Sequence, residues 1–149
     1  LNTRFIELAG EVNARMPGYV VDQVIRGLNR TSRAVHGAKI AVIGIAYKKD
    51  VDDPRESPAF EIMEELLHLG AELSYHDPHI PHMPRMRKHD IKLSSQPLTP
   101  QYLAAQDCVL IVTDHTAVDW GLVHKQARLI VDPRNALAKV QGSREHVIS

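Results

Sequence analysis

The chain has 149 residues, a length that suits one domain with a sizeable hydrophobic core. Apolar residues make up 44% of it and charged residues 24%, which excludes an intrinsically disordered or fibrous chain. Its 18 basic side chains balance 18 acidic ones, so no long-range field draws it toward nucleic acid or an anionic membrane, and we expect neither as a partner.

The cysteine content and the first residues bear on the cellular setting. Cys108 is the only cysteine and cannot form an internal disulfide, and the run Cys-Val-Leu-Ile-Val is typical of a buried strand. No stretch approaches the ~20 apolar residues of a membrane span and no export signal is present, so we expect a reducing, cytoplasmic location. The chain begins Leu-Asn-Thr-Arg in a helical pattern, and we expect it to be a piece of a longer protein.

Helical periodicity dominates the first 36 residues. Apolar residues recur at spacings of three and four over residues 1–15 and again over residues 20–33. Pro17 and Gly18 stand between these stretches. We expect them to separate two helices, the second of which ends before Gly37.

From Lys39 onward the pattern changes to short apolar runs. Residues 40–43 are typical of a strand buried on both faces, and residues 71–75, 108–112 and 129–131 have the same character. Residues 44–57 form a charged loop between the first two of these strands.

Helices are predicted between the strands. One begins at Pro58 with Ser57 as its cap and stops at Gly70, and its buried stripe comprises Ala59, Ile62, Met63, Leu66 and Leu67. Thr99 is expected to cap a short helix over residues 100–105, and a further helix is expected near residues 118–126.

Two segments lack clear periodicity. Residues 78–98 are rich in proline and are predicted to be mostly loop, with a short edge strand at residues 91–93, and the polar tail after Lys139 is predicted to fray. The alternation of strands and helices predicts an α/β fold, an open parallel sheet with helices on both faces that is Rossmann-like but incomplete.

Ligands of such sheets bind at the carboxyl ends of the strands, where segments 44–57, 76–82 and 113–120 are expected to lie. The first of these begins Gly-Ile-Ala-Tyr-Lys-Lys, which starts like the G-x-G-x-x-G fingerprint and then departs from it. Ala46 and Lys49 stand where the second and third glycines belong, so we reject an NAD-binding Rossmann domain within this chain.

The same loop offers positive charge and an aromatic ring. Tyr47, Lys48, Lys49 and Arg55 suit a phosphorylated ligand. The alternative, given about equal weight, is that these are solvated loop charges. Carboxylates that could balance them are Asp50, Asp52, Asp53 and Glu56.

Histidines suggest two further sites, neither of which we expect. His76, His79, His82 and His89 cluster in sequence, but the intervening prolines prevent a helix that would align them, and no metal is predicted. Asp114-His115 follows a buried strand, and we interpret it as loop and cap chemistry with ligand contact left open, because no nucleophilic serine motif accompanies it.

Several longer motifs carry a resemblance to a known family. They are Lys-Ile-Ala-Val-Ile-Gly-Ile-Ala-Tyr-Lys-Lys-Asp-Val-Asp-Asp-Pro-Arg-Glu-Ser-Pro-Ala from residue 39, then Gly-Ala-Glu-Leu-Ser-Tyr-His-Asp-Pro, Ala-Gln-Asp-Cys-Val-Leu-Ile-Val-Thr-Asp-His and Val-Asp-Pro-Arg-Asn-Ala-Leu. Together with the upstream Val-Asn-Ala-Arg-Met-Pro-Gly-Tyr-Val-Val they closely resemble the C-terminal domain of nucleotide-sugar 6-dehydrogenases, the UDP-glucose and GDP-mannose dehydrogenase family. The segment Thr-Asp-His-Thr-Ala-Val-Asp-Trp most resembles the bacterial UDP-N-acetylglucosamine 6-dehydrogenases.

The resemblance implies an enzyme of three parts, in which an NAD-binding domain and a central dimerising helical domain precede a domain that binds the nucleotide sugar. Residues 1–36 would be the end of the central domain and residues 37–149 the UDP-binding domain. The family oxidises the C6 hydroxyl of a UDP-sugar to a carboxylate with NAD. Cys108 does not match its catalytic cysteine, so the fragment alone is expected to be inactive and the parent enzyme to be a homodimer or higher homo-oligomer.

The resemblance also implies roles for four residues. Tyr47 and Lys48 match the aromatic-lysine pair beside the nucleotide sugar, and Arg134 lies near an arginine that contacts the nucleotide. Arg55 matches an arginine that faces the NAD cofactor across the domain cleft. No catalytic residue and no metal ligand is expected in this chain.

Two other classes of function stay open. One is a free-standing nucleotide-binding or regulatory module without oxidoreductase activity, and the other is an oligomerisation or interaction domain. The second would show no thermal shift with UDP.

Overall fold

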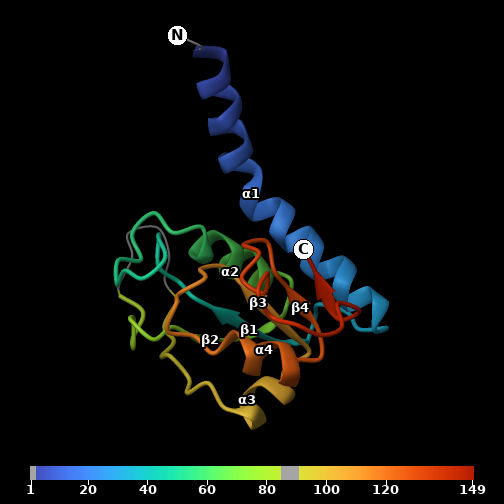
Figure 1. Ribbon diagram of the computed structural model, residues 1–149. Coiled ribbons are helices and arrows are strands. Elements are labelled where there is room, and N and C mark those ends of the chain that lie inside the picture. Colours follow the sequence, from blue (N-terminus) through green and yellow to red (C-terminus); the bar gives the residue numbers. More distant parts are fainter. Residues whose placement is uncertain (1–2, 85–90) are drawn as a thin grey trace.

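The computed structural model describes residues 3–84 and 91–149 (Figure 1). In chain order its elements are α1 (Thr3–Arg30), β1 (Lys39–Ile43), α2 (Ala59–His68), β2 (Glu72–His76), α3 (Pro100–Ala104), β3 (Cys108–Ile111), α4 (Trp120–Gln126), β4 (Ile130–Val131) and β5 (Val147–Ile148). The strands form one parallel sheet in the order β2-β1-β3-β4-β5. The predicted α/β fold with an open parallel sheet is therefore confirmed.

Helices cover both faces of the sheet. In β1, Ile40 and Val42 enter the core shared with α1 and α2, whereas Ala41 and Ile43 enter the core shared with α3 and α4. Successive side chains of a strand point to opposite faces, so a strand buried on both faces reads as a continuous apolar run. Among the helices of the described residues, none has the length and apolarity that crossing a lipid bilayer requires.

The helix after the charged loop begins and ends close to the predicted residues. Ser57 Oγ accepts a hydrogen bond from the Ala59 N–H at 3.2 Å, and Gly70 ends the segment with a φ of +92°. The predicted buried stripe is correct except for Leu67, which is 42% exposed. Phe60, which the predicted stripe omits, is buried.

The first helix differs from the prediction. α1 continues through Pro17 and Gly18 as one helix, although the axis changes direction about midway along it (Figure 1). A proline removes one backbone hydrogen bond and kinks a helix without having to end it. The half that follows Pro17 buries Val20, Val24 and Leu28 against the sheet, and this packing stabilises the helix beyond the kink.

The tail also differs from the prediction. Residues after Lys139 were expected to fray, but Val147–Ile148 form β5 at the edge of the sheet. The Ile130 N–H donates to the His146 carbonyl at 2.8 Å, and the Asp132 N–H donates to the Ile148 carbonyl at 2.7 Å. These bonds satisfy backbone groups that β4 would otherwise expose at the sheet edge.

The proline-rich segment is irregular where it is described. In place of the predicted strand at residues 91–93, single bridges form at Ser94 and Ser95, opposite His82 and Tyr75 respectively. Residues 85–90 lie outside the described part of the chain, and the loop prediction is not tested there.

Candidate functional site

Three segments meet at the carboxyl ends of β1, β2 and β3, as predicted. Asp77, directly after β2, accepts a hydrogen bond at Oδ2 from the Ile45 N–H, which follows β1, at 2.8 Å. The ring of His115, from the segment after β3, lies 3.0 Å from the same oxygen. Hydrogen bonds to the buried carboxylate of Asp77 therefore join the three segments.

The turn after β1 has a structural need for glycine. Gly44 has a φ of +81°, a conformation that side chains disfavour, and a Cβ there would overlap the carbonyl oxygen of Thr113. The Thr113 hydroxyl donates to the Ala46 carbonyl at 2.7 Å, and the Ser57 hydroxyl donates to the same oxygen at 3.3 Å. Atoms of Thr113 and Ser57 thus occupy the space next to this turn.

A pocket of about 380 Å³ opens beside this loop. Its walls come from α1, α2, the loop after β1 and the segments after β3 and β4. The lining residues are Val20, Tyr47, Lys48, Glu56, Pro58, Ile62, Val112, Pro133 and Arg134. The pocket therefore brings together Tyr47, Lys48 and Arg134, which the sequence predicts as substrate-binding residues.

The polar side of the pocket has a defined geometry. The Lys48 ammonium lies 5.8 Å from the centre of the Tyr47 ring, and the ring is 46% exposed. Arg134 is oriented by its Nε, which donates to the Val112 carbonyl at 2.8 Å. Two cations and an aromatic face beside an apolar wall can bind an anion that also carries a planar group.

Arg134 owes its place to a turn built on Asp132. The buried Asp132 carboxylate accepts hydrogen bonds from the Ala136 N–H at 2.9 Å and the Leu137 N–H at 3.0 Å. Asn135 adopts a φ of +59°, which asparagine tolerates better than most residues. The guanidinium is thus presented from a closed turn after β4.

Arg55, the fourth predicted site residue, is not among the described residues that line the pocket. Its Nε and Nη2 donate to the two carboxylate oxygens of Asp53, each at 3.0 Å. This bidentate contact lowers the pKa of Asp53. The predicted contact of Arg55 with a cofactor stays a prediction.

The histidines that cluster in sequence separate in space. His76 Nδ1 lies 2.7 Å from the Gln96 carbonyl, and His82 Nδ1 lies 3.0 Å from the Ser94 hydroxyl. His79 instead reaches the ring of His115, with ring centres 4.7 Å apart and planes at 79°. His89 lies outside the described residues.

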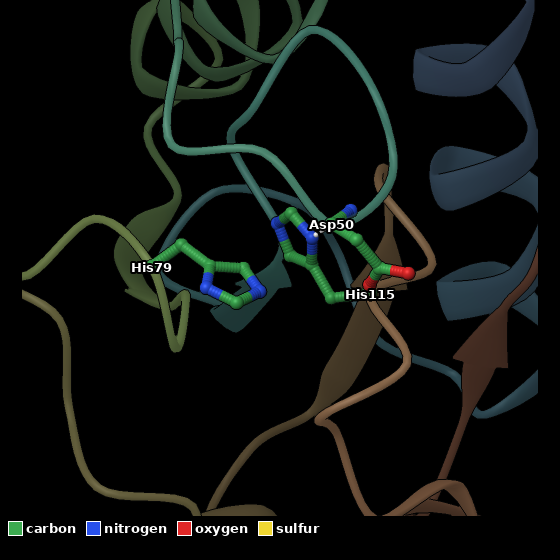
Figure 2. Close-up of side chains that lie close together, drawn as sticks. All are labelled: Asp50, His79 and His115. Atoms are coloured by element: carbon green, nitrogen blue, oxygen red, sulfur yellow. Dashed lines mark hydrogen bonds between the residues drawn. The ribbon is translucent and has the colours of Figure 1, made fainter.

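Asp50, His79 and His115 lie near one another (Figure 2), with one candidate ligand atom from each within 4.8 Å of the others. Both ring nitrogens of His115 are engaged, however. Nδ1 lies 2.9 Å from the Asp50 N–H, and Nε2 lies against Asp77. A cation could use this ring only after displacing one of those contacts, so the residues fit a metal poorly.

The partner of His115 was not predicted from the sequence. His115 is completely buried and pairs with Asp77, not with its neighbour Asp114. The available signal was an Asp-Pro directly after one strand and an Asp-His after another, because parallel strands bring their carboxyl ends to one edge.

Cys108 behaves as predicted. It is fully buried in β3, and burial raises the pKa of its thiol to about 12. A thiol that stays protonated inside a strand is a packing residue, not a nucleophile.

Comparisons with known proteins show which family the chain resembles. Residues 41–139 match the model of the UDP-glucose/GDP-mannose dehydrogenase family, UDP binding domain. The UDP-N-acetyl-D-mannosamine dehydrogenase of Methanococcus maripaludis strain C7 is 34% identical over 118 residues, which cover 78% of this chain and 25% of that protein. The enzyme of the same name from Escherichia coli K12 is 34% identical over 132 residues, covering 83% and 30%.

Solved structures show the same likeness. A structure of the UDP-N-acetyl-mannosamine dehydrogenase from Staphylococcus aureus superposes with a TM-score of 0.68 at 31% identity, covering 99% of this chain and 32% of that one. The chain therefore spans between a quarter and a third of the length of these relatives. Their names do not support the finer resemblance to UDP-N-acetylglucosamine enzymes in particular. The match over residues 41–139 nevertheless covers most of the chain, which belongs to the UDP-glucose/GDP-mannose dehydrogenase family and carries its UDP-binding domain.

Proposed function

We propose that this chain is the substrate-binding part of an NAD-dependent nucleotide-sugar 6-dehydrogenase, which oxidises the C6 hydroxyl of a UDP-sugar to the UDP-uronic acid. The observation that carries the proposal is the pocket in which Tyr47, Lys48 and Arg134 meet. Its contribution to catalysis is positioning. A fixed diphosphate holds C6 of the sugar close to the thiol and nicotinamide that other parts of the enzyme supply.

Each pocket residue has a distinct task in this proposal. The Lys48 ammonium, a compact charge on a flexible stem, binds phosphate or sugar oxygens. Arg134 binds the nucleotide through its planar guanidinium, and Tyr47 offers its exposed ring as a flat contact surface. Val20 and Ile62 add apolar surface to the same pocket.

Two observations bear on the identity of the sugar, and they point to different UDP-sugars. The sequence motifs resemble UDP-N-acetylglucosamine enzymes, whereas the relatives described above carry UDP-N-acetylmannosamine in their names. Both sugars are UDP-N-acetylhexosamines, and we propose that class as the substrate. Comparing UDP-glucose, UDP-N-acetylglucosamine and UDP-N-acetylmannosamine in one titration series ranks the candidates.

The remaining expectations concern the whole enzyme. We propose that Arg55, exposed on the loop after β1, faces the NAD pyrophosphate across a cleft shared with the NAD-binding domain. We also propose that the enzyme works in the cytoplasm as a homodimer or larger homo-oligomer.

Lys48→Ala tests the pocket assignment. Loss of one charge-assisted contact of about 1.5 kcal/mol is expected to weaken UDP-sugar binding by about tenfold. Lys49→Ala is the matched control, because Lys49 is the adjacent exposed lysine and is not among the described residues that line the pocket. Binding is measured by NMR titration, which detects affinities in the millimolar range.

Equal binding by both variants and the wild type would reject the role of Lys48. The absence of any UDP-sugar effect on the wild-type spectrum would instead favour an interaction domain over a nucleotide-binding one.

A further inference from the structure

The loop that carries Tyr47 and Lys48 has little hydrophobic anchoring. Residues 47–52 are all exposed. The Tyr47 N–H donates to the Asp53 carbonyl at 2.8 Å and closes the loop on itself. What holds its tip to the rest of the protein is a set of polar contacts at Asp50.

Two residues of the segment after β3 make these contacts. The Thr116 N–H and hydroxyl donate to the Asp50 carboxylate, both at 2.6 Å. The Asp50 N–H donates to Nδ1 of His115 at 2.9 Å (Figure 2). Thr116 lies at the surface, whereas the ring of His115 is completely buried.

The geometry fixes the proton on the His115 ring. A backbone N–H can only donate, so Nδ1 accepts and carries no proton. The single ring proton therefore lies on Nε2, which donates to Asp77 Oδ2 at 3.0 Å. Asp77 is itself held by the N–H groups of Ile45 at 2.8 Å and His79 at 2.8 Å.

His79 encloses the ring from another side. Its ring lies edge-on to that of His115 and points toward it (Figure 2). Its Nε2 is buried and has no hydrogen-bond partner among the described residues. The described polar contacts of the His115 ring are thus with Asp77 and Asp50, and His79 lies against it.

We infer that His115 is a positioning residue for the nucleotide-sugar pocket: oriented by Asp77, it accepts the Asp50 N–H and holds the loop that presents Tyr47 and Lys48. This inference rests on the proposed function of that pocket. Without the contact, the exposed loop samples more conformations, and ligand binding has to order it at a cost in affinity.

Two substitutions test separately the two hydrogen bonds of the His115 ring, to the Asp50 N–H and to Asp77. In His115→Asn, the side-chain oxygen lies as many bonds from the backbone as Nδ1 does and can still accept the Asp50 N–H. In His115→Gln, the side-chain nitrogen corresponds to Nε2 and can still donate to Asp77, but the acceptor for Asp50 is lost. His76→Gln, at the same sheet edge but directed to the Gln96 carbonyl, is the control.

The inference predicts different binding losses for the two variants. His115→Gln should weaken binding of UDP-N-acetylmannosamine by ~5-fold, the worth of about one hydrogen bond, and His115→Asn by less than about twofold. His76→Gln should bind like the wild type. Thermal unfolding, measured alongside, should show both His115 variants destabilised, because each loses one buried bond.

Equal binding losses in the two His115 variants, or unchanged binding in His115→Gln, would overturn the inference. If neither variant folds, two measurements on the wild type decide. Long-range ¹H–¹⁵N spectra should show His115 protonated at Nε2, and the Asp50 amide should exchange slowly. An Nδ1-protonated ring or a fast-exchanging Asp50 amide would overturn it.

These outcomes differ from a failure of the proposed function. If Lys48→Ala weakens binding and His115→Gln does not, only the inference about His115 fails. If the wild type binds no UDP-sugar, the pocket assignment fails and with it the positioning role.

Discussion

Asp77 shows how a buried carboxyl stays ionised. It is 2% exposed, and burial by itself raises the pKa of its carboxyl. Hydrogen bonds from His115, Ile45 and His79 outweigh burial, so the pKa lies below its ordinary value of 3.8. At neutral pH the carboxylate therefore forms charge-assisted bonds to all three segments at the site.

The lowered pKa predicts how stability depends on pH. A carboxyl with a depressed folded-state pKa stabilises the protein above its unfolded-state pKa, and this contribution is lost as pH falls through the folded value. Asp77→Asn should therefore lower the free energy of unfolding by about 1–3 kcal/mol at pH 7, and the difference from wild type should shrink below about pH 4. Urea unfolding between pH 3 and pH 7 measures it.

An exposed carboxyl of the neighbouring loop provides the comparison. Asp52→Asn should change the free energy of unfolding by less than about 0.5 kcal/mol at neutral pH. A constant Asp77→Asn deficit across the whole pH range would contradict the lowered pKa.

Tyr47 and Lys48 are easier to predict from the sequence than the pair of His115 and Asp77. Tyr47 and Lys48 are adjacent in a motif, so one short segment carries the signal. His115 and Asp77 are 38 residues apart, and their contact depends on the order in which the strands pair. The order of the strands is a property of the folded sheet, and the sequence of either segment alone does not predict it.

At the scale of elements, two glycines illustrate opposite constraints. Gly44, in the turn after β1, needs a positive φ and has the Thr113 carbonyl against it. Gly18 lies within α1 and has no atom near the position of a Cβ. The first glycine is required by the fold, and the second only weakens its helix.

Alanine substitutions at these glycines should have opposite signs. Gly44→Ala should lower the free energy of unfolding by about 2 kcal/mol or more, because it adds strain to a steric overlap. Gly18→Ala should raise it by up to about 1 kcal/mol, since alanine favours the helix. Chemical denaturation of both variants measures the values, and a neutral Gly44→Ala would show that the turn can rearrange.

The sequence predicted the strands more accurately than the ends of the chain. A continuous apolar run such as residues 40–43 is typical of a strand that is buried on both faces. The position and type of this strand were therefore predicted correctly. The continuation of α1 through Pro17 depends on packing of its second half. Likewise, β5 forms because β4 offers unpaired backbone groups, which the polar composition of the tail does not reveal.

At the scale of the molecule, the sheet separates two cores, and its β5 edge closes one end. Ile148 packs against the core beneath α1, and Val147 packs against the core beneath α4. This short strand therefore contributes to both cores as well as to the sheet.

Removal of residues 146–149 tests that contribution. It should lower the free energy of unfolding by at least about 2 kcal/mol, through lost apolar burial and the loss of the backbone hydrogen bonds that join these residues to β4. Because the edge of β4 becomes exposed, self-association should also increase in sedimentation experiments. Removal of Ser149 alone, an exposed residue, should change neither property.

The contact between α1 and β5 has a consequence for biosynthesis. A Cβ on Gly27 would lie 2.6 Å from Ile148 Cδ1 and 3.2 Å from Leu129 Cδ2, so helix and strand touch closely there. Synthesis on the ribosome makes α1 well before β5. Part of the surface of α1 therefore stays exposed until residue 148 has left the exit tunnel and Ile148 can pack against the helix.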